Sequence, residues 1–181
     1  ALPAPRGARF REWLEPRLPA VALLWSAGVL LMATHLFAGW VRVKRIRRRA
    51  SVLETSNWPA RVRAMAGRFA ATRRVRLLVS SIVDVPAVIG FLRPAILVPA
   101  SALSGLTPAH LEAILLHELA HVRRGDYLVN VVQCVGEVLL FYHPAVWWVS
   151  SQIRREREHC CDDVAASLCA DRMTYARALT S

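Results

Sequence analysis

The feature that most constrains the fold of this chain is an uncharged apolar run over residues 20–41. A helix of about 20 such residues crosses the hydrocarbon core of a bilayer. Trp25 and Trp40 lie near the two ends of the run, where indole rings favour the membrane interface. The hydrophobic content of 55% is also high for a water-soluble domain. We therefore predict a transmembrane helix over residues 20–41, with a buried helix of a soluble domain as the alternative.

Basic residues follow the apolar run directly: Arg42, Lys44, Arg45, Arg47, Arg48 and Arg49. A net charge of +11 suits nucleic acid, anionic lipid or the flank of a membrane span. This cluster adjoins the span and lacks the interleaved aromatic residues of a nucleic-acid surface. We therefore expect a lipid bilayer as a partner and no nucleic acid. By the positive-inside rule this end faces the cytoplasm, although the arginines of residues 6–17 make the other flank basic too.

A second constraint is the HELAH pattern at residues 117–121, inside an apolar-periodic segment over residues 111–124. The segment has signals for a start and a stop: Thr107 as N-cap, Pro108 in the first turn and Gly125 at the end. In a helix, a separation of four places His117 and His121 one turn apart on one face. Both imidazoles can then bind one Zn²⁺ ion. Glu118 can lie beside the metal and take a proton from bound water.

A zinc centre of this kind needs a third protein ligand, and Glu158 is the candidate. Two histidines and one glutamate leave a fourth position open for water, which is the catalytic arrangement of zinc. Asp162 follows four residues after Glu158 in a predicted helix and can accept the outer N–H of a ligand histidine. The alternative is a solvated helix face, because arginines surround these acids.

Other side chains compete for a metal role. Cys160 and Cys161 adjoin the proposed ligand, and Glu137 and His143 lie in the apolar segment 127–149. We favour small buried residues for the two cysteines and a structural role for His143, which precedes a proline. No Cys-x-x-Cys pair occurs in the chain, so we predict reduced thiols rather than a disulfide framework.

The remaining segments predict a mainly helical α+β fold. Residues 59–73 and 127–149 read as helices, with Asp126 as the cap of the second and a break at Pro144. The second segment carries polar residues, so we favour a core helix that grazes the bilayer over a second membrane span. Residues 75–83 read as a strand, and residues 91–99 contain a second short strand between two prolines. The prolines confine this strand to a sheet edge or end it early. An open edge there can pair with an extended peptide, whereas a plain β-hairpin that caps the core is the alternative.

Several motifs together resemble the BlaR/MecR-type membrane metallopeptidases, which are bacterial sensor-transducers of β-lactam exposure and their relatives. The residues that carry the likeness are Pro86, Gly90 to Pro99, His117 to His121 with Arg124-Gly125-Asp126, Phe141-Tyr142-His143-Pro144 with Trp147-Trp148, and Arg157-Glu158 with Asp162. The likeness covers roughly residues 10–180. The resemblance implies a gluzincin-like zinc endopeptidase domain on the cytoplasmic side of the bacterial inner membrane, among further transmembrane helices of the same protein.

The resemblance also implies residue roles and a division of the chain. It implies His117, His121 and Glu158 as zinc ligands and Glu118 as the catalytic carboxylate. We expect a leader over residues 1–19, the transmembrane helix over 20–41, a basic cytoplasmic linker over 42–58 and the zinc metallopeptidase domain over 59–181. The implied substrate is a protein or peptide, such as the chain itself or a transcriptional repressor. β-Lactam sensing is not carried over.

Two further expectations concern catalysis. Tyr175 and Arg172 are candidates for stabilising the oxyanion, with ordinary helix-surface residues as the alternative. A different function also stays open, which is a membrane-bound signalling or scaffold module with a structural zinc site. An intact Glu118 argues against that function, because a structural site needs no base. A nucleic-acid binder would predict a steep salt dependence of DNA binding.

Overall fold

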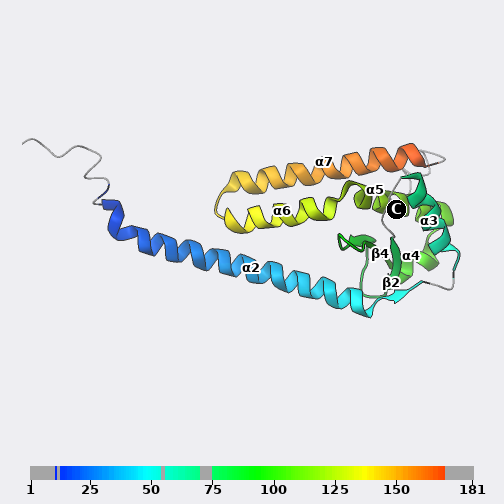
Figure 1. Ribbon diagram of the computed structural model, residues 1–181, viewed down its shortest axis with the longest axis horizontal. Helices are drawn as coiled ribbons and strands as arrows, with labels where there is room; N and C mark the ends of the chain where they lie inside the picture. Colours follow the sequence, from blue (N-terminus) through cyan, green and yellow to red (C-terminus); the bar gives the residue numbers. More distant parts are fainter. Residues whose placement is uncertain (1–10, 12, 54–55, 70–74, 170–181) are drawn as a thin grey trace, which may run out of the picture.

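One long helix projects from a smaller globular part (Figure 1). The computed structural model describes residues 11, 13–53, 56–69 and 75–169. A short 3₁₀ turn, η1 (Glu15–Arg17), leads into helix α2 (Leu18–Arg49). No residue of α2 is buried. Among the described residues, the helical stretch Glu15–Arg49 alone is long and apolar enough to cross a membrane.

Helix α2 continues through the basic residues that the sequence analysis assigned to a linker. It ends only at Ala50, where the backbone becomes extended with ψ of 137°. The side chain of Arg47 donates from Nη2 to the carbonyl oxygen of Arg93 over 3.0 Å. The candidate membrane-spanning part of α2 is therefore connected to the globular part by continuous helix over residues 42–49. The hydrogen bond from Arg47 to Arg93 ties the end of this helix to the globular part.

The globular part contains a four-stranded sheet. Its strands are β1 (Ser51–Val52), β2 (Arg76–Ser80), β3 (Ala87–Ile89) and β4 (Ala95–Pro99), in the order β1-β2-β4-β3. Strands β2 and β4 are parallel, and both outer pairs are antiparallel. The predicted strand over residues 75–83 is confirmed in its central part. Strands β1 and β3 were not predicted, because two or three residues are too few to show an alternating pattern.

The expectation of an edge position for the strand within residues 91–99 is wrong. Strand β4 lies inside the sheet, and all five of its residues are buried. Ile96 and Val98 face one hydrophobic cluster, whereas Ala95 and Leu97 face another. Burial on both faces explains the continuous apolar sequence. The other alternative, that the prolines end the strand early, is confirmed, since Pro94 precedes β4 and Pro99 is its last residue.

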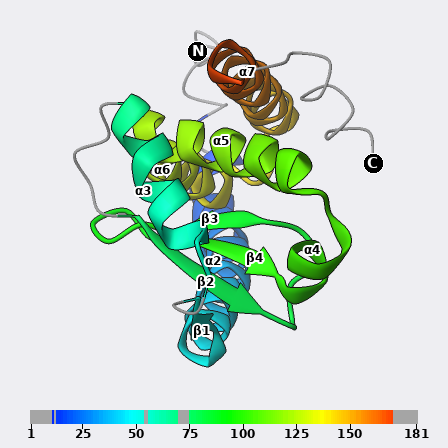
Figure 2. The same cartoon turned by 90° about the vertical axis from the view of Figure 1, so that its right-hand side faces the viewer.

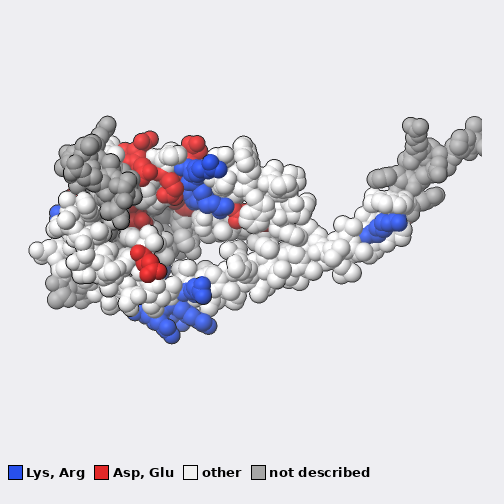
Figure 3. Space-filling view, turned by 180° about the vertical axis from the view of Figure 1, so that it is seen from behind, with Lys and Arg blue, Asp and Glu red and all other residues white. Residues whose placement is uncertain are grey.

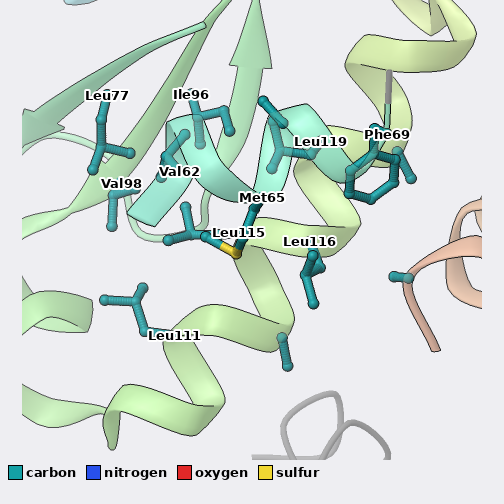
Figure 4. Packing of buried hydrophobic residues seen from close by; sticks show 14 of the residues in the cluster. Val62, Met65, Phe69, Leu77, Ile96, Val98, Leu111, Leu115, Leu116 and Leu119 are labelled. Atoms are coloured by element: carbon teal, nitrogen blue, oxygen red, sulfur yellow. The ribbon is translucent and has the colours of Figure 1, made fainter. Parts of the chain in front are cut away.

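Helices cover both faces of this sheet. Helix α3 (Trp58–Arg68) and helix α5 (Pro108–Arg124) pack on one face, as Figure 2 shows, and the short helix α4 (Ala100–Gly105) leads into α5. Their buried side chains form the main core with β2 and β4 (Figure 4). The end of α2 contributes Ile46 and Ala50 to the cluster on the other face. Helix α5 is thereby fixed against the sheet by Leu111, Leu115 and Leu119.

The last two described helices form a hairpin. Helix α6 (Asp126–Leu139) and helix α7 (Pro144–Leu168) are joined by a short turn, and Figure 1 shows them extending beside α2. The break predicted at Pro144 is confirmed, because α7 begins there. The second half of α7 returns to the globular part, where Cys161 and Ala165 join the main core. This return brings α7 next to α5.

Candidate metal centre

Helix α5 carries both histidines and has the ends that its sequence predicts. The Thr107 side chain accepts a hydrogen bond from the backbone N–H of His110, and Gly125 ends the helix with a left-handed φ of 71°. Pro108 occupies the first turn. The apolar face of α5 is buried in the core, so the turn that carries His117 and His121 is held in a fixed position.

Three donor atoms from α5 and α7 converge at one point. The Nε2 atoms of His117 and His121 are 3.1 Å apart. Oε2 of Glu158 lies 3.4 Å from the first and 3.6 Å from the second. Donors around one tetrahedral ion, with bonds of about 2.0–2.2 Å, lie about 3.3–3.6 Å apart. The three side chains therefore have the spacing and the chemistry to hold a single divalent cation.

Each histidine also places its other ring nitrogen against a carboxylate. Nδ1 of His117 lies 2.9 Å from Oδ1 of Asp162, and Nδ1 of His121 lies 2.7 Å from Oδ2 of Asp126. Such contacts fix the tautomer and the orientation of an imidazole and leave Nε2 as the metal-binding atom. Both histidines are thus held with Nε2 pointing to the same place.

Asp126 was assigned a different position by the sequence analysis, as a helix cap. That prediction is wrong, since Gly125 is at the N-cap position and makes no side-chain cap. The Asp126 side chain is buried against His121 instead. In the sequence, Asp126 follows directly after Gly125, which ends the histidine helix, and this position is compatible with both a cap and the contact with His121.

Asp126 is held in its position by two residues of α7. The Sγ atom of Cys161 donates to its Oδ2 over 3.3 Å, and Nη1 of Arg157 donates to its backbone carbonyl oxygen over 3.2 Å. Burial raises the pKa of the Cys161 thiol, and the neighbouring Asp126 carboxylate raises it further. The thiol therefore stays protonated and acts as a hydrogen-bond donor, as expected for a small buried residue.

Cys161 also belongs to a second group of donors, with His121 and Asp126. This group does not have the spacing of a metal site. The Nδ1–Oδ2 distance of 2.7 Å is that of a hydrogen bond and is shorter than the separation of about 3.3 Å expected for two ligands of one tetrahedral ion. The first group, with Glu158, is the better metal site.

Glu118 is almost fully buried beside the two histidines, with 8% of its surface exposed. Burial raises the pKa of its carboxyl group, and the neighbouring imidazoles of His121 and His117 oppose that rise. The backbone N–H of Val88 donates to its carboxylate. Because Val88 belongs to strand β3 at the sheet edge, Glu118 lies between the metal-binding atoms and that edge strand.

The other candidates take no part in this group. Glu137 accepts from Nη1 of Arg154 over 2.9 Å, and Nδ1 of His143 accepts from the backbone N–H of Ala145 at the start of α7. Neither they nor Cys160 belong to a cluster of metal-binding donors within the described residues. Tyr175 and Arg172 lie outside those residues.

Comparison with known proteins supports the same kind of site. The sequence pattern of the family described as BlaR1 peptidase M56 matches residues 11–181. The chain belongs to the BlaR1 peptidase M56 family. Membership in a metallopeptidase family implies a metal cofactor, and the group of His117, His121 and Glu158 has the donors to hold one. The resemblance found in the sequence is confirmed.

Two relatives of this M56 chain are much longer than the part that it matches. The regulatory protein BlaR1 of Bacillus licheniformis is 24% identical over 139 residues, which are 77% of this chain and 23% of the relative. The methicillin resistance mecR1 protein of Staphylococcus aureus is 24% identical over 143 residues, which are 78% of this chain and 24% of the relative. The chain spans about a quarter of the length of the curated relatives it matches.

Proposed function

We propose that this M56 chain is the catalytic part of a membrane-anchored zinc endopeptidase that cleaves a protein substrate in a signalling pathway. The observation that carries the proposal is the convergence of two Nε2 atoms and one carboxylate oxygen from α5 and α7. The names of the relatives, a regulatory protein and a resistance protein, support a role in signalling. The basic end of α2 supports a cytoplasmic position of the catalytic part.

The protonation of the histidines supports a cation at this point. When Nδ1 donates its hydrogen to a carboxylate, the Nε2 atom of a neutral imidazole carries a lone pair. Two such lone pairs 3.1 Å apart repel each other unless a positive charge lies between them. Zinc fits the donor set, because it accepts imidazole nitrogen and carboxylate oxygen together in a tetrahedral arrangement.

Glu118 is assigned the role of general base. Zinc bound by His117, His121 and Glu158 would supply an acidified water and polarise the scissile carbonyl group. Glu118 is then placed to accept the proton of that water and to return it to the leaving amine. Its burial beside the two histidines places the carboxylate next to the proposed metal position, where it can take up and return a proton.

Strand β3 offers a place for the substrate backbone. It lies at the edge of the sheet, and no described strand pairs with its outer side. Its residue Val88 contacts Glu118, so a peptide that adds to this edge lies beside the proposed base. The strand addition considered for β4 thus moves to β3. Because the N–H of Val88 is already bonded to Glu118, main-chain groups next to it would hold an extended peptide.

Replacement of Glu118 by Gln tests this function. The full chain, loaded with zinc in detergent, is incubated with a mixed peptide library, and the products are identified by mass spectrometry. We expect the wild type to cleave peptides, and Glu118→Gln to keep one zinc per chain without cleavage. Glu156→Gln, at an exposed position on α7, is the matched control and should cleave like the wild type. Peptide cleavage by Glu118→Gln at the wild-type rate would refute the assignment.

A further inference from the structure

The turn of the α6–α7 hairpin touches the first half of the apolar part of α2, at Trp25 and Gly28. Nε1 of Trp25 donates to the carbonyl oxygen of Leu139 over 3.2 Å. The Phe141 ring packs so closely on Gly28 that a Cβ atom there would collide with it. These contacts join residues more than a hundred positions apart in the chain and fix the depth of the turn relative to α2.

If α2 spans a bilayer, that depth lies inside the bilayer. At a rise of 1.5 Å per residue, about 26 Å of helix separates Trp25 from Arg42, where the basic cluster begins. The hydrocarbon core of a bilayer is about 30 Å thick. If α2 crosses the bilayer with its basic cluster at one surface, the turn between α6 and α7 cannot lie in water on that side.

The surface of the hairpin is suited to lipid. Its outward side chains are large and apolar, with 65% of Val132 and 64% of Trp148 exposed, and Leu128, Val135 and Val149 also exposed. Glu137 is the one Asp, Glu, Lys or Arg between Asp126 and Arg154. Water-soluble proteins rarely expose an apolar surface of this extent, and such a surface marks contact with a membrane or a partner.

Several polar groups of the hairpin are paired within it, although the buried Oε1 atom of Gln133 has no hydrogen-bond partner among the described residues. Glu137 of α6 accepts from Arg154 of α7 at 2.9 Å, and Nε2 of Gln133 donates to the backbone carbonyl of Ser150 at 3.1 Å. Nε1 of Trp147 donates to the carbonyl oxygen of Phe141 in the turn over 2.8 Å. Internal pairing of this kind is required in hydrocarbon, where no water replaces a missing partner.

Basic side chains mark one level along the molecule. Figure 3 shows Lys and Arg at the base of the hairpin, beside Asp and Glu, and at the end of α2, with mostly uncharged surface beyond them until a further basic patch near the start of α2. The exposed arginines of these elements include Arg123 in the last turn of α5, Arg155 on α7, and Arg45 and Arg48 near the end of α2. Arginines at one level suit the plane of anionic lipid headgroups.

We propose that the α6–α7 hairpin, over about residues 127–153, inserts into the bilayer beside α2 and returns to the same side. Lipid hydrocarbon, rather than another protein, covers the exposed apolar surface of the hairpin. The reason is that the hairpin turn contacts α2, which has the length and composition of a membrane span. Helix α7 covers about 15 Å from Pro144 to Arg154, toward the basic side of the molecule, and reaches Glu158 about one turn later. The hairpin therefore holds the metal-binding group at the membrane surface.

Spin labels on the full chain in liposomes test the insertion. Cys134, Cys160 and Cys169 are replaced by Ala, and the fully buried Cys161 is kept. Single labels are then placed at Val132→Cys and Trp148→Cys. Leu24→Cys, at a residue 74% exposed on α2, is the lipid reference, and Ala64→Cys, on the exposed side of α3, is the aqueous reference. Collision rates with oxygen and with a water-soluble nickel complex are measured for each label.

We expect the labels at residues 132 and 148 to match the lipid reference, with at least a tenfold higher ratio of oxygen to nickel collisions than the label at residue 64. Ratios like that of the aqueous reference would overturn the proposal. So would low collision rates with both reagents, since these mean that protein covers the hairpin. If the label at residue 24 is itself in water, α2 does not span the bilayer and the proposal fails. None of these outcomes depends on peptidase activity.

Discussion

Nδ1 of His121 lies 2.7 Å from Oδ2 of Asp126, across the turn that Gly125 makes between α5 and α6. His117 has an equivalent contact with Asp162 from α7. The two carboxylates come from different elements, yet each holds one histidine with its Nε2 atom toward Glu158. The proposed zinc site thus depends on five side chains, and only three of them would touch the metal.

Asp126→Asn should weaken zinc binding without abolishing it. The amide can still accept from His121, but it lacks the charge that makes the imidazole a stronger ligand, and losses of about 10- to 100-fold in metal affinity are usual for such partners. Competition with a chromophoric zinc chelator measures the affinity. Asp163→Asn is the control, because Asp163 is exposed on α7. Equal zinc affinity in the two variants would show that Asp126 does not support the ligand.

The three proposed ligands should be needed for stoichiometric zinc. His117→Ala and Glu158→Ala each remove one of the three converging donors, so we expect zinc to fall well below one ion per chain after dialysis. His159→Ala is the matched control, since His159 is exposed next to Glu158. Metal content is measured by plasma mass spectrometry. One tightly held zinc in either ligand variant would exclude this ligand set.

Glu118 should make the stability of the metal-free chain depend on pH. Burial raises its pKa above the ordinary value of 4.5 in the folded chain, so the folded state disfavours the ionised carboxylate. Ionised Glu118 destabilises the folded chain fully at a pH above the pKa that Glu118 has in the folded state. This destabilisation is absent at a pH below the pKa that Glu118 has in the unfolded state. Glu118→Gln should therefore raise the melting temperature at pH 8, and the gain should shrink as the pH falls toward 4. Thermal unfolding of the metal-free chain measures this, with Glu156→Gln as an exposed control.

Local sequence signals predicted the parts of the site that depend on one helix. Thr107, Pro108 and Gly125 gave the limits of α5, because capping and chain reversal depend on residues close to each other in sequence. The spacing of His117 and His121 gave their common face. The approach of Glu158 to the two histidines was inferred from the chemistry of zinc. No local sequence pattern indicates this contact, because Glu158 follows His117 by 41 positions.

Other features could not be predicted, because tertiary packing decides them. The central position of β4 depends on the end of α2, which covers the second face of the sheet. The two prolines around β4 gave no indication of this cover. Asp126 could equally cap a helix or face a histidine, and the choice depends on the contacts of Arg157 and Cys161 from α7. A helix over residues 127–149 with a break at Pro144 was predicted, but neither the continuation of α7 to Leu168 nor the contact of the turn with Trp25 was.

Gly125→Ala should destabilise the chain through the junction between His121 and Asp126. Gly125 has a φ of 71°, and an L residue with a side chain in this left-handed conformation costs about 1–2 kcal/mol. Gly67→Ala is the matched control, because a Cβ at this position of α3 meets no atom within 4 Å and alanine is favoured over glycine in a helix by about 0.5–1 kcal/mol. Chemical denaturation should therefore give changes of opposite sign for the two variants. Since Gly125 sets the position of Asp126 relative to His121, Gly125→Ala should also lower zinc affinity, and a stability loss with unchanged zinc affinity would show that the turn does not position this carboxylate.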